Sequence, residues 1–334
     1  MECKNVSIVV IGYNEAQNLE NTFHSIQLMN YPPELIEVIY VDSGSKDKSM
    51  AIAEKYADKV FLEDVFPSSG RNRNRGLMEA SYDIVHFIDG DVSIDPDYLA
   101  AAVPLFKEKD VQAVVGQVDE QNPGLLNKVA ALENSKKIEG YTQYTATGAT
   151  YVKQALLGIN GYDERIKRGQ ETELGERFIA NGNRIWCMAQ KMGSHNFEIN
   201  TPLDFVRRYR NDATSQVQSA YMKGDSQHFI NLKKRYKKAM VKLLVFLVVL
   251  AVSIALQSIW IFLAYTILTT LNRNKAIFKR YFRDYPNLVL IRTLIDFFLI
   301  VFWWYGFFKE SFNYQFKNSP HSVYQLSKQI LEGK

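Results

Sequence analysis

The sequence predicts an α/β protein with a doubly wound sheet, followed by a separate region of apolar, membrane-associated helices. Three observations support this prediction. Short β-rich runs alternate with helical stretches over residues 1–118, which is typical of parallel strands with helices on both faces. Several runs are apolar at consecutive positions, as expected for strands that are buried on both sides. A long run near the C-terminus carries no charged residue and is long enough to enter a bilayer.

We expect four strands in the first part of the chain, with helices between them. The strands are predicted at 6–13, 36–42, 59–62 and 83–88, and the helices at 15–28, 46–56 and 70–80. Sheets of this kind bind ligands at the carboxyl ends of their strands. Asp42 and the turn Asp89-Gly90-Asp91 follow two of these strands, so we expect both in a binding site.

The following part of the chain contains more helix than strand. A helix is predicted from Asp95, with Pro96 in its first turn, and a strand at 111–118. Three more helices are predicted at 125–140, 149–157 and 170–180. We interpret residues 119–230 as the second part of one continuous domain that covers 1–230.

Residues 231–334 form the predicted membrane-associated helical region, with hydrophobic segments at about 241–271 and 287–308. No charged residue occurs from Leu243 to Leu271, and basic residues flank this run on both sides, as at a membrane edge. A buried core helix is the alternative. We favour a shallow re-entrant or interfacial hairpin slightly over a single tilted helix, because the run is too short for two complete spans.

Composition limits the possible functions. The net charge is only +4, which gives no reason to expect a nucleic-acid partner. Cys3 and Cys187 are the two cysteines, and they indicate neither a disulfide framework nor a zinc site. The N-terminus lacks the pattern of a secretion signal. We therefore expect a protein of the cell membrane whose main domain is on the cytoplasmic face.

The turn Asp89-Gly90-Asp91 is suited to metal and nucleotide binding. A transferase that uses a nucleoside-diphosphate sugar must stabilise negative charge on the departing diphosphate, which a carboxylate-bound Mg²⁺ or Mn²⁺ can do. An Asp-X-Asp triplet alone is also common in solvated turns. Its position after a buried strand favours the functional interpretation.

Four segments in this order resemble family 2 glycosyltransferases: 6–15 (VSIVVIGYNE), 41–47 (VDSGSKD), 73–76 (RNRG) and 89–91 (DGD). The resemblance covers about residues 5–225 and implies the GT-A fold, a Rossmann-like mixed sheet, with inverting chemistry. It implies nucleotide-sugar binding at 1–118 and acceptor binding at 119–230. The residues it places at the nucleotide sugar are Tyr13, Glu15, Asp42, Arg73, Asn74 and Asp89, with Asp91 as the metal ligand. For Asp42 a turn cap, and for Arg71, Arg73 and Arg75 a solvated helix face, are the alternatives.

The segment Gly169-Gln170-Glu171-Thr172-Glu173-Leu174 is similar to the family's Glu-Asp pair, whose Asp is the catalytic base. The resemblance therefore implies Glu171 as the base, although Gln170 replaces the preceding acid. A helix N-terminus that attracts acidic residues is the alternative. His195 falls where some relatives have a histidine near the metal, and is a weaker metal candidate. Further weak candidates for acceptor or phosphate contact are Gly148, Gln170, Arg207 and Arg208.

The predicted function is the transfer of a sugar, with a UDP-sugar as the expected donor, to an acceptor hydroxyl in glycan or polysaccharide biosynthesis. A membrane anchor favours a lipid-linked acceptor over a free saccharide. One alternative is direct transfer to a polyprenyl phosphate. Another is an inactive nucleotide-sugar-binding membrane protein, with the Gln170-Glu171 departure as the sign of lost turnover. A transport protein is disfavoured, because it would leave the first 225 residues unexplained.

Overall fold

The computed structural model describes residues 4–64, 68–120, 124–131, 138–143, 145, 148–166 and 169–195, together with 244–249, 251–273 and scattered shorter stretches between 201 and 309. Contacts divide the chain into two units. The first unit comprises residues 1–122 and 135–197, and the second comprises 123–134 and 198–334. The predicted boundary near residue 230 stays a prediction, since the contacts place the division after residue 197 and assign 123–134 to the C-terminal unit.

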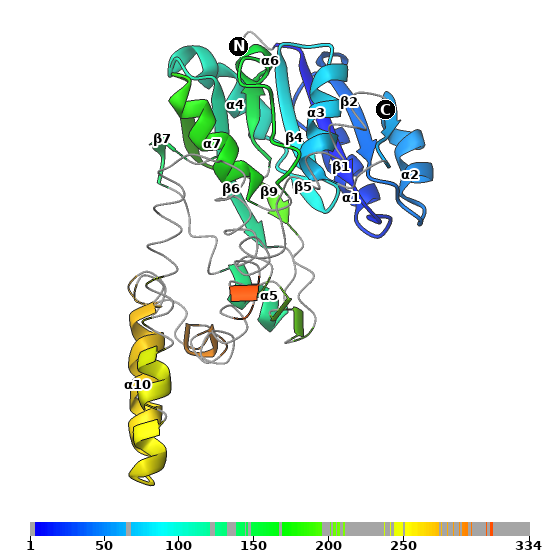
Figure 1. Cartoon of the computed structure of the whole chain (residues 1–334). Coiled ribbons are helices and arrows are strands. Elements are labelled where there is room, and N and C mark those ends of the chain that lie inside the picture. Colours follow the sequence, from blue (N-terminus) through cyan, green and yellow to red (C-terminus); the bar gives the residue numbers. More distant parts are fainter. Residues whose placement is uncertain are drawn as a thin grey trace, which may run out of the picture. The chain divides into compact units, whose positions relative to one another are not determined.

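The first unit is built on one mixed sheet, which confirms the predicted α/β class (Figure 1). Its strands are β1 (Val6–Gly12), β2 (Ile36–Asp42), β3 (Lys59–Leu62), β4 (Ile84–Asp89), β5 (Val92–Ile94), β6 (Ala113–Glu120), β7 (Gly140–Thr142), β8 (Thr150–Val152) and β9 (Ile185–His195). The order is β3-β2-β1-β4-β8-β6-β9-β5, and β7 pairs with β9. Strands β3, β2, β1 and β4 are mutually parallel, whereas β8 runs antiparallel to both of its neighbours.

Helices cover both faces of this sheet. They are α1 (Leu19–Gln27), α2 (Ser49–Tyr56), α3 (Ser69–Glu79), α4 (Tyr98–Glu108), α6 (Lys153–Leu157) and α7 (Gln170–Ala180), with the short 3-10 helix η1 (Pro33–Leu35) before β2. One apolar core contains residues of α1, α2 and α4, and the other contains residues of α3, α6 and α7. Strand β1 is apolar at consecutive positions because both of its faces are buried: Val10 belongs to the first core and Val9 to the second.

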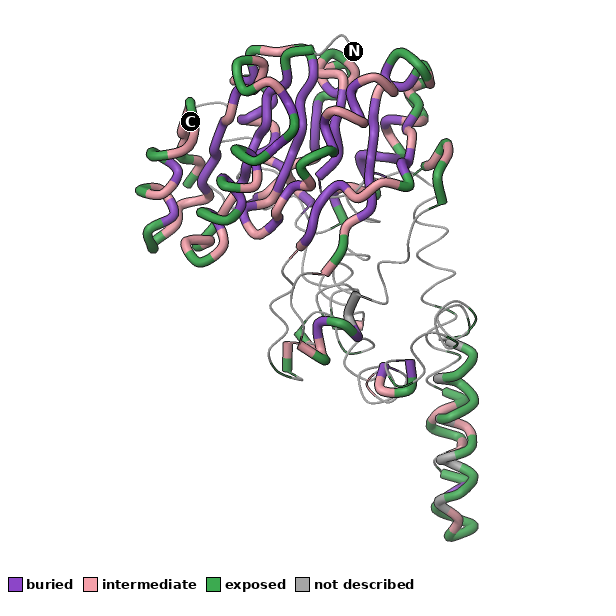
Figure 2. The backbone as a smooth tube through the Cα atoms, turned by 180° about the vertical axis from the view of Figure 1, so that it is seen from behind, coloured by how far each residue is buried: buried purple, intermediate pink, exposed green. Residues whose placement is uncertain are grey.

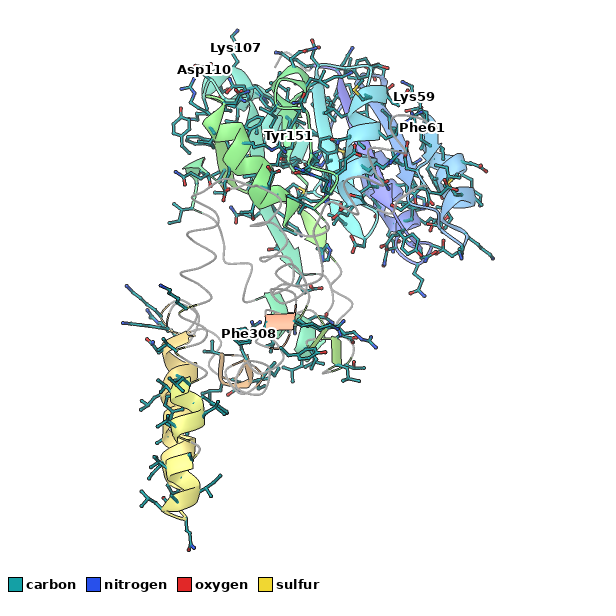
Figure 3. The ribbon with its side chains drawn as sticks, viewed as in Figure 1. Lys59, Phe61, Lys107, Asp110, Tyr151 and Phe308 are labelled. Carbon is teal, nitrogen blue, oxygen red and sulfur yellow. The ribbon has the colours of Figure 1, made fainter. Side chains whose placement is uncertain are left out.

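The strands form the buried interior of the unit (Figure 2). Figure 3 shows Tyr151 of β8 within this interior, where it is fully buried, and Lys107 and Asp110 at the surface. The carboxyl ends of β1, β2 and β4 lie side by side along one edge of the sheet, the edge where these parallel strands end, because Gly12 pairs with Asp42 and Ile11 with Asp89. This edge holds the candidate site.

Two of the predicted helices differ from the structure. The helix predicted at 149–157 begins only at Lys153, because Thr150 to Val152 form β8 against β4 and β6. The helix predicted at 125–140 is described as α5 (Leu125–Ala131), and residues 140–142 form β7. These strands have three residues each, so their pairing depends on neighbours distant in sequence and no local period reveals them.

The second unit contains α5 and α10 (Ile259–Arg273) among its described residues. Helical residues 251–255 precede α10, and the chain turns between them. Gln257 has a positive φ of 49°, Gln257 N donates to Ile254 O, and Ser258 N donates to Ser253 O, which together make a Schellman turn. Many apolar side chains here are exposed, including Trp260 at 75% (Figure 2). No helix in the described part of the chain is both long enough and apolar enough to cross a membrane.

Candidate active site

Asp42 ends β2 and is fully buried. Its Oδ1 accepts hydrogen bonds from the backbone N–H groups of Gly44 and Ser45 at 2.8 and 2.5 Å, and its Oδ2 from the hydroxyls of Tyr40 and Ser45 at 2.8 and 2.7 Å. Four donors occupy most of the acceptor capacity of a carboxylate. Asp42 therefore shapes the turn after β2, as in the turn-capping alternative.

Arg73 of α3 lies at the centre of the site and is 3% exposed. Its Nη2 is 2.8 Å from Asp89 Oδ1, and its Nη1 is 3.4 Å from Glu171 Oε1. The guanidinium also lies over the ring of Tyr162, 5.3 Å from the ring centre. Arg73 is thus neither on a solvated helix face nor extended towards solvent, and it joins two carboxylates that are distant in sequence.

The two other arginines of this helix have a different environment. Arg71 Nε is 2.8 Å from Glu63 Oε2, and Arg75 Nη2 is 3.1 Å from Glu79 Oε1. Arg75 also lies over the ring of Phe61 on the edge strand β3, which is labelled in Figure 3. These two residues form the half-exposed outer side of α3.

Glu171 lies in the first turn of α7, where the helix dipole favours a negative charge. The residue before it, Gln170, is 2% exposed; its Oε1 accepts from Ser69 and Arg73, and its Nε2 donates to Ile166 O. Glu173 is also buried, and both of its oxygens accept from Arg177, with the Nη2–Oε2 distance at 2.8 Å. Arg177 in turn donates to the carbonyls of Ile159 and Gly161. Glu171 is therefore the more accessible carboxylate of the two.

Asp91 immediately precedes β5 and meets His195, the last residue of β9, because Val92 of β5 pairs with His195. His195 Nε2 is 3.1 Å from Asp91 Oδ2. Burial alone would lower the pKa of His195, but the hydrogen bond and charge of Asp91 raise it above its ordinary value. Burial raises the pKa of Asp89, and Arg73 opposes this rise.

The remaining nucleotide candidates line the same edge of the sheet. Asn74 holds the loop before α7, because its Nδ2 donates to Tyr162 O and to Glu164 Oε1, both at 2.9 Å. Glu15 follows β1 and its side chain lies beside Gly90, since a Cβ at Gly90 would be 3.2 Å from Glu15 Cγ. Tyr13 is half exposed. Asn74 is thus used within the fold, whereas Tyr13 is open to a ligand.

Among the weaker candidates, Gln170 joins this group, because its Oε1 accepts from Arg73 Nη1 at 3.0 Å. Gly148 has a φ of 80°, and a Cβ there would be 2.1 Å from Met192 Cε, so glycine is needed for the backbone and for packing. Arg207 belongs to the second unit and pairs with Asp204 at 3.4 Å. Arg208 lies outside the described residues.

The side chains around Asp91 fit a divalent cation whose coordination is completed by substrate oxygens. Asp91 Oδ1 is buried and has no hydrogen-bond partner among the described residues. The described part of the chain contains no group of three or more metal-ligating side chains. Mg²⁺ and Mn²⁺ sites of nucleotide enzymes commonly use one or two carboxylates and take their other ligands from phosphate and water. Asp91 and His195 would hold the ion in such a site.

Two contributors to the site were not predicted. Tyr162 packs under Arg73, and Ser69 Oγ donates to Gln170 Oε1 at 2.9 Å. Tyr162 lies in a loop between α6 and α7, where sequence patterns carry little information. Ser69 opens α3 next to the predicted RNRG segment, and its position at a helix start was the only available signal.

Carboxylates gathered at the strand ends of this sheet lie where α/β folds of this kind bind their ligands. Residues 7–160 match the model of the family described as Glycosyl transferase family 2. Glycosyltransferase AglE of Haloferax volcanii is 31% identical over 123 residues, which are 35% of this chain and 40% of AglE. Poly(ribitol-phosphate) beta-N-acetylglucosaminyltransferase TarS of Staphylococcus aureus is 26% identical over 200 residues, covering 55% of this chain and 34% of TarS. The matches thus span less than half the length of either relative.

Two solved structures share the fold. The mannosyltransferase PcManGT from Pyrobaculum calidifontis, in complex with GDP-Man and Mn²⁺, has a TM-score of 0.57 at 17% identity and covers 89% of this chain and 88% of its own. TarS 1–349 in complex with UDP-GlcNAc has a TM-score of 0.51 at 21% identity and covers 64% of this chain and 66% of its own. Residues 7–160 thus resemble family 2 glycosyltransferases, and the chain shares its fold with these two solved structures.

Proposed function

We propose that this protein is a metal-dependent, inverting glycosyltransferase that moves a sugar from a nucleoside diphosphate to an acceptor hydroxyl. One observation carries the proposal: a single buried guanidinium, that of Arg73, contacts both Asp89 and Glu171. The base candidate thus lies close to the Asp89-Gly90-Asp91 turn. A displacement at the anomeric carbon needs a base and a diphosphate site on either side of the sugar, and this arrangement supports both.

In the proposed reaction, Glu171 accepts the proton of the acceptor hydroxyl as the acceptor oxygen attacks the anomeric carbon. The bond between that carbon and the diphosphate oxygen breaks, and the nucleoside diphosphate leaves with the electron pair. Asp91 and His195 would hold a divalent cation, which supplies positive charge for the leaving diphosphate when bound. Arg73 holds Glu171 and Asp89 in place.

A UDP-sugar is the proposed donor. The relative TarS was solved with UDP-GlcNAc, and PcManGT with GDP-Man, so nucleotide sugars occupy this fold in both. We assign the base-binding wall to the loops after β1 and β2, which are joined by the hydrogen bond from Asn14 N to Ser45 Oγ, with Tyr13 after β1 as the exposed aromatic side chain. Asp42 stabilises the turn after β2, because its carboxylate accepts four hydrogen bonds from within the fold.

A thermal-shift panel of nucleotide sugars, with and without Mn²⁺, tests this function. A ligand at about 100 times its dissociation constant stabilises the folded state by roughly 2.7 kcal/mol. We expect a UDP-sugar to raise the melting temperature only when Mn²⁺ is present, and Asp91→Asn to abolish most of that rise. An equal rise with chelator in the parent, or an unchanged rise in Asp91→Asn, contradicts the metal assignment.

A lipid-linked saccharide is the proposed acceptor, in glycan or polysaccharide assembly. The exposed apolar side chains around the Schellman turn support a lipid partner for the second unit, as do the basic residues on both sides of 243–271. We propose that this segment is a helical hairpin that enters one face of the cell membrane, with the first unit on the cytoplasmic side. Direct transfer to a polyprenyl phosphate is the closest alternative, and assays with both acceptors separate the two.

A further inference from the structure

Gln170 is the departure of this chain from the family's acidic pair, and its side chain is fully used. Its Oε1 accepts from Ser69 Oγ at 2.9 Å and from Arg73 Nη1 at 3.0 Å, and its Nε2 donates to Ile166 O. A buried amide is stable only when such bonds are made. Gly70 of α3 makes room for this contact, because a Cβ there would be 3.2 Å from Gln170 Nε2. The surroundings of residue 170 are thus built for an amide.

Charge explains why an amide rather than a carboxylate suits this position. Arg73 is the one cation that contacts both Asp89 and Glu171 among the described residues. A third carboxylate at position 170 would face the same guanidinium with no further cation to balance it. Buried charge without a partner is strongly unfavourable. The amide oxygen of Gln170 accepts the same hydrogen bond without adding charge.

The distances show how Gln170 and Glu171 share one donor group. Arg73 Nη1 is 3.0 Å from Gln170 Oε1 but 3.4 Å from Glu171 Oε1. The shorter contact goes to the neutral residue, so the carboxylate of Glu171 is only loosely paired and stays open to another donor. Glu171 is also among the groups that act electrostatically on Asp89 of β4, Tyr151 of β8 and Tyr162.

We propose that Gln170 is a positioning residue for Glu171, acting through Arg73, and this rests on the proposed role of Glu171 as the base. Gln170 holds Nη1 of Arg73 and limits its ion pair with Glu171, which leaves that carboxylate a stronger acceptor for the proton of the acceptor hydroxyl. The Gln170-Glu171 pair is then a working arrangement and not a sign of lost turnover.

Two substitutions in the full chain move the pH profile in opposite directions. Gln170→Glu adds a carboxylate that competes for Arg73, so we expect the acidic limb of kcat/KM to move up by about one pH unit. Gln170→Met removes the competing acceptor and strengthens the pair of Arg73 with Glu171, so the limb moves down and kcat falls about tenfold. The KM for the nucleotide sugar changes less than twofold in both. Gln154→Glu on the exposed side of α6 adds the same charge elsewhere and should leave the profile unchanged.

The pH at the midpoint of the acidic limb of kcat/KM does not depend on the fraction of enzyme that is folded. A partly unfolded variant therefore still tests the proposal. If Gln170→Met does not fold, Gln170→Asn, whose amide is too short to reach Arg73, replaces it with the same expected direction. An unmoved limb in the folded variants overturns the proposal and leaves Gln170 a purely structural residue. Failure of the proposed function has a different signature: Glu171→Gln would then retain parental turnover, whatever the Gln170 variants do.

Discussion

Two carboxylates of α7, two positions apart, have different surroundings. Glu173 accepts hydrogen bonds from Nε and Nη2 of Arg177, which also ties α7 to the loop at 159–161. Glu171 has one longer contact with Arg73. Residues two apart on a helix point to different sides, which is why one faces the site and the other the fold.

We therefore expect Glu171→Gln to lose about 10² to 10⁴ in turnover, the usual contribution of a general base, with an unchanged melting temperature and nucleotide affinity. Glu173→Gln should instead lower the melting temperature, because it weakens a buried ion pair and leaves Arg177 with less charge compensation. Turnover and thermal unfolding are measured for both. A larger loss of turnover per folded molecule in Glu173→Gln would transfer the base role to that residue.

His86 of β4 gives the molecule a pH dependence. It is fully buried, and burial lowers its pKa from 6.5 to about 3. Its Nδ1 is 3.0 Å from Thr150 Oγ1, and its Nε2 has no partner among the described residues. The unfolded chain binds a proton below about pH 6.5 but the folded chain does so only below about pH 3. The folded state therefore loses stability as the pH falls through this window.

Between pH 7 and pH 5 this difference amounts to about 2 kcal/mol of unfolding free energy. His86→Phe should show a smaller loss over the same range, measured by urea unfolding at each pH. His24→Phe, at an exposed histidine, is the matched control and should follow the parent. Parallel curves for His86→Phe and the parent would show that His86 does not set this dependence.

Arg73 shows the limit of sequence reasoning at the residue scale. The RNRG segment predicted that Arg73 belongs to the site, and the structure places it there. Its partners Asp89 and Glu171 lie 16 and 98 positions further along the chain. No local pattern identifies such pairs, so the sequence did not predict the ion network that Arg73 forms with them. Asp42 differs, because its four donors are close in sequence: three come from Gly44 and Ser45 in the turn and one from Tyr40 of β2.

At the element scale, the parallel half of the sheet was predictable because several of its strands are largely apolar runs. Strands β1 to β4 and helices α1 to α3 lie within four residues of their predicted ends. The inserted part was less predictable. β5 and β8 have three residues each, and their conformation depends on pairing with β9, β4 and β6. The order of strands in a mixed sheet is a property of tertiary packing and has no local signal.

The approach of α3 to β1 depends on Gly76. A Cβ at this position would be 2.2 Å from Val9 Cγ1. We expect Gly76→Ala to destabilise the protein by about 1–3 kcal/mol, because an added methyl forces the helix away from the sheet. Val9→Ala creates a cavity and is destabilising as well. The double variant should lose less unfolding free energy than the two single variants lose together. Chemical unfolding of the parent, both single variants and the double variant measures this difference. Additive losses would mean that the methyl is accommodated elsewhere.

At the scale of the whole molecule, the two units differ in what supports their function. The fold of the first unit and its match at residues 7–160 support the glycosyltransferase assignment. The second unit contributes exposed apolar side chains, including Ile254, Leu256 and Trp260, and these support the proposed membrane attachment.

We expect the full chain to bind vesicles that contain anionic lipid. Ile254, Leu256 and Trp260 surround the turn before α10 and are 69%, 64% and 75% exposed. Burying each in lipid contributes about 1.5–3 kcal/mol, and the basic flanks add attraction to anionic headgroups. Replacing all three with Asp should lower vesicle binding at least tenfold in a flotation assay.

The matched control replaces Leu28 and Met78 of the first unit, which are 71% and 67% exposed, with Asp. This variant loses similar apolar surface outside the hairpin, so it should float with vesicles as the parent does. High salt should weaken the binding of the parent only in part, because the apolar contribution is not screened. Release of the parent from vesicles by salt or alkaline washing alone would contradict apolar attachment. Unchanged binding of the triple variant would place the attachment elsewhere in the chain.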